Sequence, residues 1–297
     1  MTLRTHTQPL SYRLHMPESA PAALVLDSPH SGTTYPPDFD SAVAAGVLRT
    51  AEDTWVADLW GDAPALGVPL VEARFPRAYI DANRGLHDID PALLADAWSD
   101  PIAPSRKCEL GVGLVWRLAH GGVPMYARKL RSEEIRARIE RYWRPYHLAL
   151  QRALDERHAA FGSVWHIDCH SMFAVGDELA DDAGRERADI VLGDRDGTTC
   201  EAAFTDLVAG TMRRAGYSVA INDPYKGVEL VRIHGNPARQ RHSLQIEIKR
   251  TLYMDERTLQ PNAGYHRVQR DLDRLVDAVA EYLHDRAYTG PAFSTQK

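Results

Sequence analysis

The stretch Val164–Met172, which reads Val-Trp-His-Ile-Asp-Cys-His-Ser-Met, constrains the fold of this 297-residue chain more than any other. It begins as a short apolar run, and His166, Asp168 and His170 then occupy every second position. Because side chains alternate faces along a β-strand, these three share one face of a buried strand and Cys169 lies on the other. Two imidazoles and a carboxylate at the end of one strand suit a metal or proton-transfer site. A buried strand with satisfied polar groups is the alternative.

Apolar runs alternate with helical patterns along the rest of the chain. Strands are expected at 22–26, 68–73, 164–172, 190–192, 217–222 and 242–249. Helices are expected at 50–66, 132–160 (with a kink at Pro145), 202–214 and 265–286, and loops at 85–130, 173–187 and 223–237. The alternation continues without a linker or an internal repeat. It therefore predicts one α/β domain of three layers over residues 1–297, with an irregular or edge-strand lead-in and frayed residues 289–297.

The composition is that of an ordinary globular protein, with 44% apolar and 26% charged residues. A net charge of −6 without a polybasic tract argues against nucleic acid or an anionic membrane as a partner. The three cysteines are too widely spaced for a disulfide framework or a metal knuckle. The first residues carry no signal pattern, and no apolar run is long enough to span a membrane. We therefore expect a protein of enzyme size in the reducing environment of the cytoplasm.

Polar residues follow a second predicted strand and begin a predicted helix. His30 lies in the turn Asp-Ser-Pro-His-Ser-Gly at 27–32, and Asp53 lies in the first turn of the helix at 50–66, where a helix-capping role is the alternative. Such positions converge at one edge of a parallel sheet. We therefore expect His30, Asp53 and His170 to lie together. Two imidazoles and one carboxylate would leave a position for water on a divalent cation such as zinc.

Glu247 is a carboxylate between two isoleucines in the strand predicted at 242–249. Such a group is costly to bury unless it is paired or its pKa is shifted. Near a metal site it would act as a general base and then as an acid toward a leaving amine. A salt bridge with Lys249 or Arg250 is the alternative interpretation.

Three arginines, Arg74, Arg77 and Arg84, lie within eleven residues beside apolar positions. The planar guanidinium group is suited to binding a carboxylate, so these residues are candidates for substrate binding, and solvation at the surface is the alternative. Residues 85–130 contain scattered Gly, Pro and Trp and are expected to form loops over the site. We expect the identity of the substrate to be decided there.

Several short motifs occur in a fixed order between about residues 22 and 256. They are Asp27-Ser-Pro-His-Ser-Gly, Asp53, Arg77 with Asp81-Ala-Asn-Arg84, His166-Ile-Asp-Cys-His-Ser-Met, Pro224-Tyr-Lys-Gly, Arg232-Ile-His-Gly-Asn-Pro and Leu244-Gln-Ile-Glu247. In this order they resemble the N-formylglutamate amidohydrolase (deformylase) family. The resemblance implies a three-layer α/β/α fold with a mixed, mostly parallel central sheet, like the zinc carboxypeptidase (phosphorylase/hydrolase-like) fold. It also implies hydrolysis of N-formyl-L-glutamate to formate and L-glutamate, a step of histidine degradation.

The same resemblance implies roles for individual residues at the reacting centre. His30, Asp53 and His170 would be the ligands of one zinc ion, with Glu52 as the alternative to Asp53. Glu247 would be the catalytic base.

A second set of residues is implied to contact the substrate. Arg84 would hold the substrate carboxylate, supported by Arg77 and Arg232. Arg77 or His234 would also stabilise the oxyanion, and Lys226 lies in the same predicted loop as Arg232 and His234.

Other functions remain open from the sequence. Asp168 is expected to orient a ligand imidazole rather than to bind metal. A cysteine hydrolase using Cys169 is disfavoured because the strand places this thiol on the face opposite the histidines. A zinc amidase or peptidase acting on another N-acyl amino acid, peptide or cell-wall amide is a closer alternative, and a non-catalytic metal- or ligand-binding protein is another. The acyl group, the native metal and the oligomeric state are not determined by the sequence.

Overall fold

The computed structural model describes residues 4–8, 10–17, 21–177 and 180–289. Its described strands form one eight-stranded sheet in the order β1-β2-β4-β3-β5-β8-β6-β7. The strands are β1 (Arg4–Gln8), β2 (Tyr12–Met16), β3 (Leu24–Ser28), β4 (Leu70–Ala73), β5 (Val164–Met172), β6 (Ile190–Gly193), β7 (Val219–Ile221) and β8 (Arg241–Lys249). The four central strands β4, β3, β5 and β8 run parallel, as do β6 and β7, and the other pairs are antiparallel. The predicted mixed, mostly parallel sheet is confirmed.

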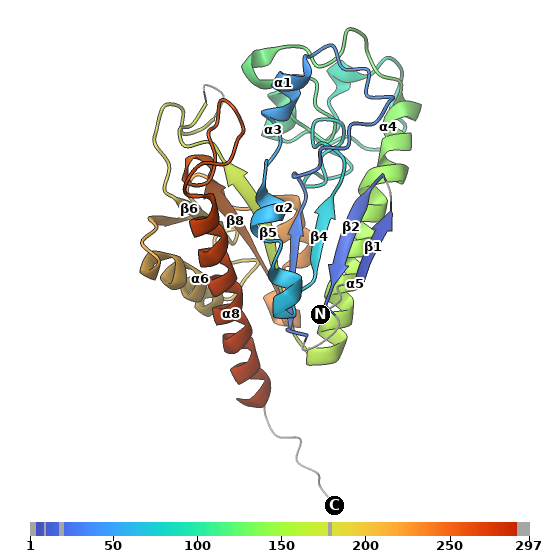
Figure 1. Ribbon diagram of the computed structural model, residues 1–297. Coiled ribbons are helices and arrows are strands. Elements are labelled where there is room, and N and C mark those ends of the chain that lie inside the picture. Colours follow the sequence, from blue (N-terminus) through green and yellow to red (C-terminus); the bar gives the residue numbers. More distant parts are fainter. Residues whose placement is uncertain (1–3, 9, 18–20, 178–179, 290–297) are drawn as a thin grey trace, which may run out of the picture.

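Helices cover both faces of this sheet (Figure 1). On one face, α2 (Val56–Leu59), α6 (Ala202–Arg214) and α8 (Tyr265–Thr289) pack against the alternate apolar residues of β3, β5 and β8. On the other face, α4 (Ser132–Arg138) and α5 (Arg144–Phe161) enclose a second apolar core with residues of β3 and β4. The predicted three-layer α/β/α arrangement is therefore confirmed.

The central strand β5 lies between β3 and β8 and is buried along its whole length. Cys169 contributes to the apolar core on the α6 and α8 side. His170 is in register with Glu247 of β8, and Asp168 is in register with Asp27 of β3. Because these strands are parallel, their carboxyl ends deliver polar side chains to the same edge of the sheet.

The prediction of one helix at 50–66 is wrong. This part of the chain forms α1 (Ala45–Arg49), α2 (Val56–Leu59) and the 3-10 turn η1 (Ala63–Leu66). The connection at 50–55 is not helical, and Trp55 there has a left-handed backbone conformation with φ 68°. Asp53 therefore lies in a loop between two short helices and does not cap a long one.

The helix predicted at 132–160 is interrupted by a π-helical turn, η4 (Ile139–Trp143). Pro145 is the second residue of α5, directly after this π-helical turn, so the irregularity expected at the proline occurs as a π-bulge just before it. The loop predicted at 223–237 contains the helix α7 (Glu229–His234), which packs against β5 and β8. This helix was missed because Pro224 and two glycines surround a short apolar segment.

The loops predicted at 85–130 are confirmed as mostly irregular chain. They contain the short helices η2 (Pro91–Leu93), α3 (Arg106–Glu109) and η3 (His120–Gly122). Two further 3-10 turns, η5 (Pro237–Arg239) and η6 (Arg250–Leu252), flank β8. The N-terminal lead-in forms the paired strands β1 and β2. The prediction of frayed residues at 289–297 falls, from residue 290 on, outside the described residues. Among the described helices, none is both long and apolar enough to cross a membrane.

Candidate metal and active site

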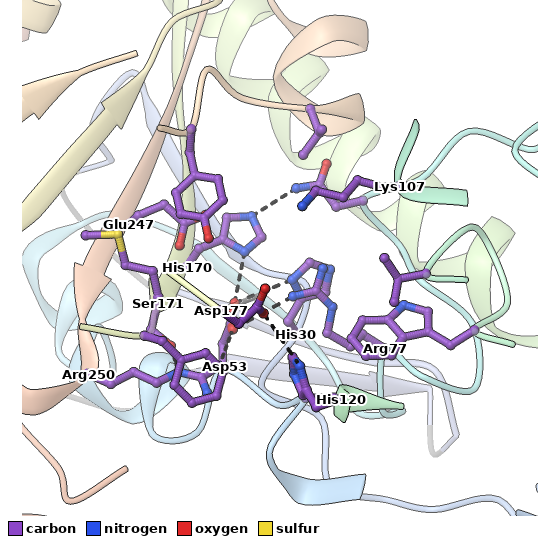
Figure 2. Close-up of a pocket in the computed structure, with 18 of the residues that line it drawn as sticks. His30, Asp53, Arg77, Lys107, His120, His170, Ser171, Asp177, Glu247 and Arg250 are labelled. Atoms are coloured by element: carbon purple, nitrogen blue, oxygen red, sulfur yellow. Dashed lines mark hydrogen bonds and ion pairs between the residues drawn. The ribbon is translucent and has the colours of Figure 1, made fainter. Parts of the chain in front are cut away.

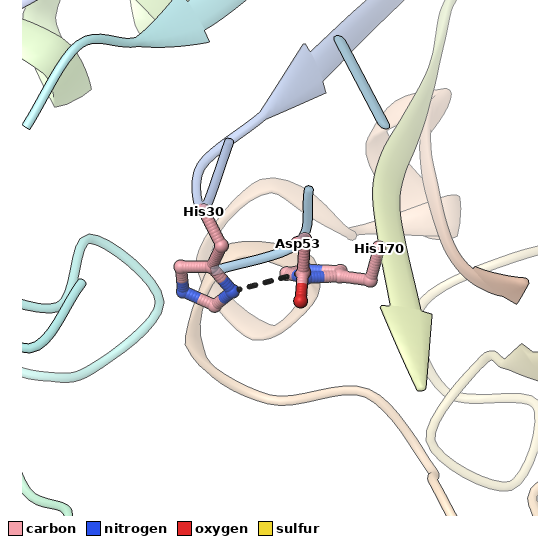
Figure 3. Close-up of side chains that lie close together, drawn as sticks. All are labelled: His30, Asp53 and His170. Atoms are coloured by element: carbon pink, nitrogen blue, oxygen red, sulfur yellow. Dashed lines mark hydrogen bonds and ion pairs between the residues drawn. The ribbon is translucent and has the colours of Figure 1, made fainter. Parts of the chain in front are cut away.

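Three segments far apart in the sequence bring His30, Asp53 and His170 together (Figure 3). His30 lies in the turn after β3, Asp53 lies in the loop between α1 and α2, and His170 lies near the end of β5. All three side chains are buried, and one nitrogen or oxygen from each lies within 4.8 Å of the others. The sequence-based expectation that these residues meet at one edge of the sheet agrees with this geometry.

The two imidazoles of the cluster are oriented in the same way. His30 Nε2 lies 2.7 Å from Asp81 Oδ1, and His170 Nε2 lies 2.7 Å from Asp168 Oδ1. The Nδ1 atoms of both rings instead face Asp53 Oδ2, at 3.4 Å and 3.0 Å. Metal-binding histidines commonly have one nitrogen on the metal and the other on a carboxylate. Asp168 thus lies where it was expected, beside a candidate ligand imidazole.

Charge and hydrogen bonding at the cluster also fit a divalent cation. His30 Nδ1 is buried and has no hydrogen-bond partner among the described residues. Burial alone would raise the pKa of Asp53, but the imidazoles of His170 and His30 hold it well below its usual range. Burial opposes a charge on His170, yet Asp168 and Asp53 raise its pKa well above the usual value. Three buried carboxylates, those of Asp53, Asp81 and Asp168, thus surround two imidazoles, a donor set that suits zinc or a similar ion.

Arg250 fixes the loop that carries Asp53. Its guanidinium donates to the backbone carbonyl oxygens of Thr50 and Glu52, at 3.1 Å and 2.7 Å, and to Asp53 Oδ1 at 3.2 Å. The Glu52 side chain points elsewhere and accepts hydrogen bonds from Tyr35 and Arg49. The geometry therefore brings Asp53, and not Glu52, to the two histidines.

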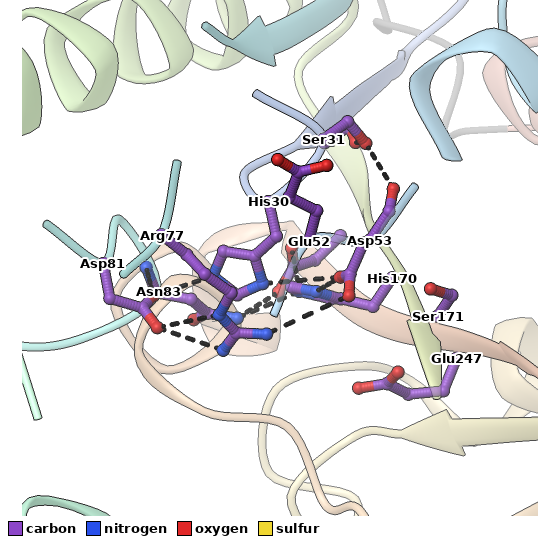
Figure 4. A network of polar contacts seen from close by, with 12 residues as sticks. His30, Ser31, Glu52, Asp53, Arg77, Asp81, Asn83, His170, Ser171 and Glu247 are labelled. Carbon is purple, nitrogen blue, oxygen red and sulfur yellow. Dashed lines mark hydrogen bonds and ion pairs between the residues drawn. The ribbon is translucent and has the colours of Figure 1, made fainter. Parts of the chain in front are cut away.

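Glu247 lies beside the cluster in the same pocket (Figure 4). Its side chain is buried, Gln245 Nε2 donates to Glu247 Oε1 at 2.9 Å, and burial raises the pKa of Glu247 to about 7. The alternative salt bridges do not form, because Lys249 pairs with Asp189 and Arg250 pairs with Asp53. A carboxylate with a pKa near neutrality can both accept and return a proton.

The pocket that contains the cluster is lined by several basic residues (Figure 2). Arg77 donates to Asp81 from Nε and from one terminal nitrogen, and its other terminal nitrogen lies 3.9 Å from Asp53 Oδ1. The remaining basic residues besides the cluster histidines are Lys107, His120, Arg187 and Arg250. The pocket is therefore suited to an anionic small molecule.

The residues expected to bind the substrate carboxylate do not line this pocket. Arg84 is buried and donates to the backbone oxygens of Asn83 and Val112, facing a neighbouring cavity that Arg232 also lines. Lys226 and Arg232 are exposed and paired with Asp196 and Glu229, and His234 packs edge-on against the His166 ring. The geometry thus gives no support to these four assignments, although Arg77 does lie in the pocket.

Four basic pocket residues were missed by the sequence analysis as candidates for binding, namely Lys107, His120, Arg187 and Arg250. Arg250 follows Glu247 by three residues, and this proximity could have indicated it. Lys107 and His120 lie in the region 85–130, where the sequence shows no regular pattern.

His166 and Cys169, the other two polar or reactive side chains of β5 considered above, lie away from the cluster and serve the packing of the sheet. His166 Nε2 and Nδ1 hydrogen bond with Asp27 of β3 and Ser243 of β8, so His166 joins three strands. Cys169 lies in the apolar core, where burial raises the pKa of its thiol well above the usual value. This environment disfavours a cysteine nucleophile.

The fold and the site define a three-layer α/β protein whose parallel strands deliver a candidate divalent-metal site and a buried glutamate to one pocket. A family model described as N-formylglutamate amidohydrolase matches residues 22–254, and the chain belongs to this family. N-formylglutamate deformylase of Pseudomonas putida is 30% identical over 241 residues, which cover 78% of this chain and 82% of the relative.

Two solved structures are also similar to this chain. The crystal structure of N-formylglutamate amidohydrolase from Ralstonia eutropha JMP134 has a TM-score of 0.90 and 49% sequence identity, and the match covers 93% of this chain and 99% of that one. The gene product Atu2144 from Agrobacterium tumefaciens has a TM-score of 0.64 at 21% identity, covering 88% and 92% of the two chains. The second likeness shows the fold alone.

Proposed function

We propose that this protein is a metal-dependent amidohydrolase that converts N-formyl-L-glutamate and water to formate and L-glutamate. The observation that carries the proposal is the position of Glu247, buried beside the His30–Asp53–His170 cluster in a pocket with basic walls. The names of the deformylase and amidohydrolase relatives support the same substrate.

His30, Asp53 and His170 would hold the metal ion, for which zinc is the first candidate. When bound, a divalent cation polarises the carbonyl group of an amide and lowers the pKa of water.

Glu247 accepts a proton from the attacking water as the new C–O bond forms at the formyl carbon. It then donates this proton to the amide nitrogen as the C–N bond breaks, which releases formate and the amino group of glutamate. Arg77 lies against Asp53 at the edge of the cluster, where its charge stabilises the negative oxygen that develops during attack.

The proposal is tested by measuring formate release from N-formyl-L-glutamate before and after treatment with a chelator, with N-formyl-L-methionine as a second substrate. Acetate release from N-acetyl-L-glutamate is followed in parallel. We expect activity on N-formyl-L-glutamate alone, loss of that activity with the chelator and recovery with zinc. Release of acetate or of methionine would instead support an amidase of broader or different specificity, and turnover that survives complete metal removal would contradict the mechanism.

A further inference from the structure

The basic residues of the pocket differ in one respect, which is whether their charge is already neutralised. Three of the five are arginines that pair with an acidic group: Arg77 with Asp81 (3.0 Å), Arg187 with Asp182 (2.7 Å) and Arg250 with Asp53 (3.2 Å). The fourth, His120, lies 3.9 Å from Asp177, and burial lowers its pKa, which disfavours a charge on its ring. Lys107 is the exception. Within the described residues, its ammonium group makes no hydrogen bond and no ion pair.

The position of Lys107 makes this lack of a partner significant. Lys107 is partly buried, and it lines both the pocket with the cluster and the neighbouring cavity lined by Arg84. Burial and then the positive charge of Arg84 lower the pKa of its ammonium group, and the opposing effect of Asp177 and Asp181 is smaller and acts without an ion pair. A partly buried ammonium group without a counter-ion is costly, and an anionic ligand would remove that cost.

The backbone around Lys107 is held by several hydrogen bonds although it belongs to a region of loops. Ser105 caps α3 by accepting a hydrogen bond from the Cys108 N–H, and the Asp88 carboxylate in turn accepts hydrogen bonds from the Ser105 N–H and hydroxyl group. The Val112 N–H donates to the Lys107 carbonyl oxygen at 2.9 Å. This support fixes where the lysine side chain begins, as a binding group requires.

We propose that Lys107 binds the side-chain carboxylate of the substrate and makes the pocket selective for acidic N-acyl amino acids. This inference rests on the proposed function, since it assumes that an N-acyl amino acid is bound with its amide at the cluster.

The position of Lys107 in the pocket favours the side-chain carboxylate over the α-carboxylate. In N-formylglutamate the α-carboxylate is attached to the carbon that carries the amide nitrogen, so it must lie close to the cluster. Arg77 and Arg250, whose guanidinium nitrogens lie 3.9 Å and 3.2 Å from Asp53 Oδ1, are the basic residues at that place. Lys107 lies on the pocket wall formed by α3, across from Glu247 of β8 (Figure 2), where the far end of an extended substrate would lie.

The test measures binding without turnover, in metal-loaded protein that carries Glu247→Gln. Titration calorimetry compares N-formyl-L-glutamate with N-formyl-L-glutamine, which has the same α-carboxylate and a neutral side chain. We expect Lys107→Met to weaken binding of the glutamate compound by at least tenfold and binding of the glutamine compound by less than twofold. Lys107→Arg, which keeps the charge, should retain part of the preference.

Lys129→Met is the matched control, because Lys129 is exposed and belongs to the same region but lines neither the pocket nor its neighbouring cavity. It should leave both affinities unchanged. An equal loss for the two compounds in Lys107→Met, or no loss, would overturn the inference, as would failure of the Glu247→Gln protein to bind either compound.

The proposed function is judged separately, by formate release from the wild-type protein. Wild-type protein that releases no formate, together with acid selectivity that depends on Lys107, would contradict the reaction and retain the binding role.

Discussion

Glu52 and Asp53 are neighbours in the sequence, but their carboxylates lie in different surroundings. Asp53 faces the two imidazoles, and Glu52 accepts hydrogen bonds from Tyr35 and Arg49. The pair therefore offers a matched test of which residue holds the metal. We expect Asp53→Asn to lose most of its bound metal and Glu52→Gln to retain it, as measured by elemental analysis of dialysed protein. Equal metal content in the two variants would exclude Asp53 as a necessary ligand.

The proposed catalytic role of Glu247 can be tested separately from metal binding. The Glu247 carboxylate lies beside the cluster but is hydrogen-bonded to Gln245 and is not one of its three members. Glu247→Gln should therefore keep the metal. It should lower kcat by roughly 10²- to 10⁴-fold, the usual contribution of general acid–base catalysis. The measurement is steady-state formate release with metal content determined on the same sample. Turnover close to that of the wild type with a full metal content would show that another group moves the proton.

At the scale of secondary-structure elements, the site depends on how the end of β8 holds the loop between α1 and α2. Arg250, in the turn that follows β8, makes three hydrogen bonds to this loop. Groups that orient metal ligands typically change metal affinity by 10- to 100-fold when they are removed. We expect Arg250→Met to weaken metal affinity by about this factor, measured by competition with a chelator of known affinity.

The control for Arg250 is Arg257→Met, a loss of the same type of side chain at an exposed position beyond the same turn. It should leave the affinity unchanged. If Arg250→Met, like the control, binds metal as tightly as the wild type, the loop at 50–55 holds Asp53 in place without the hydrogen bonds from Arg250.

At the scale of the whole molecule, burial of histidines makes stability depend on pH. His147 stacks on Trp143 and hydrogen bonds with the Ala82 carbonyl oxygen, and burial lowers the pKa of His147 from 6.5 to about 4. Below pH 6.5 the unfolded chain therefore binds a proton that the folded protein excludes until about pH 4. The free energy of unfolding contributed by this group is complete above pH 6.5 and falls as the pH decreases, by about 2 kcal/mol between pH 7 and pH 5.

His147→Gln keeps a hydrogen-bond donor but cannot be protonated. We expect the difference in unfolding free energy between pH 7 and pH 5, measured by urea denaturation, to be smaller in this variant than in the wild type by about 2 kcal/mol. An identical pH dependence in the two proteins would show that His147 titrates normally in the folded state.

The sequence predicts those parts of the molecule that depend on local patterns. β5 and β8 were identified because their side chains alternate between the two faces of a buried sheet, and their parallel order then placed His170 and Glu247 at one edge. The segment 50–55 was predicted wrongly because its shape depends on Arg250 and on the His30 carbonyl oxygen, which are distant in the sequence. The position of Lys107 depends in the same way on Asp88, through Ser105.

The bonds from Arg250 to the loop at 50–55 span 197 to 200 residues, and this separation has a consequence for the order in which the protein is made. On the ribosome, His30 and Asp53 emerge long before Glu247 and Arg250. A nascent chain that has not yet reached β8 lacks both Glu247, the proposed proton acceptor, and Arg250, which anchors the loop at 50–55. The proposed active site is therefore complete only near the end of synthesis, and a chain that ends before β8 carries His30, Asp53 and His170 without Glu247.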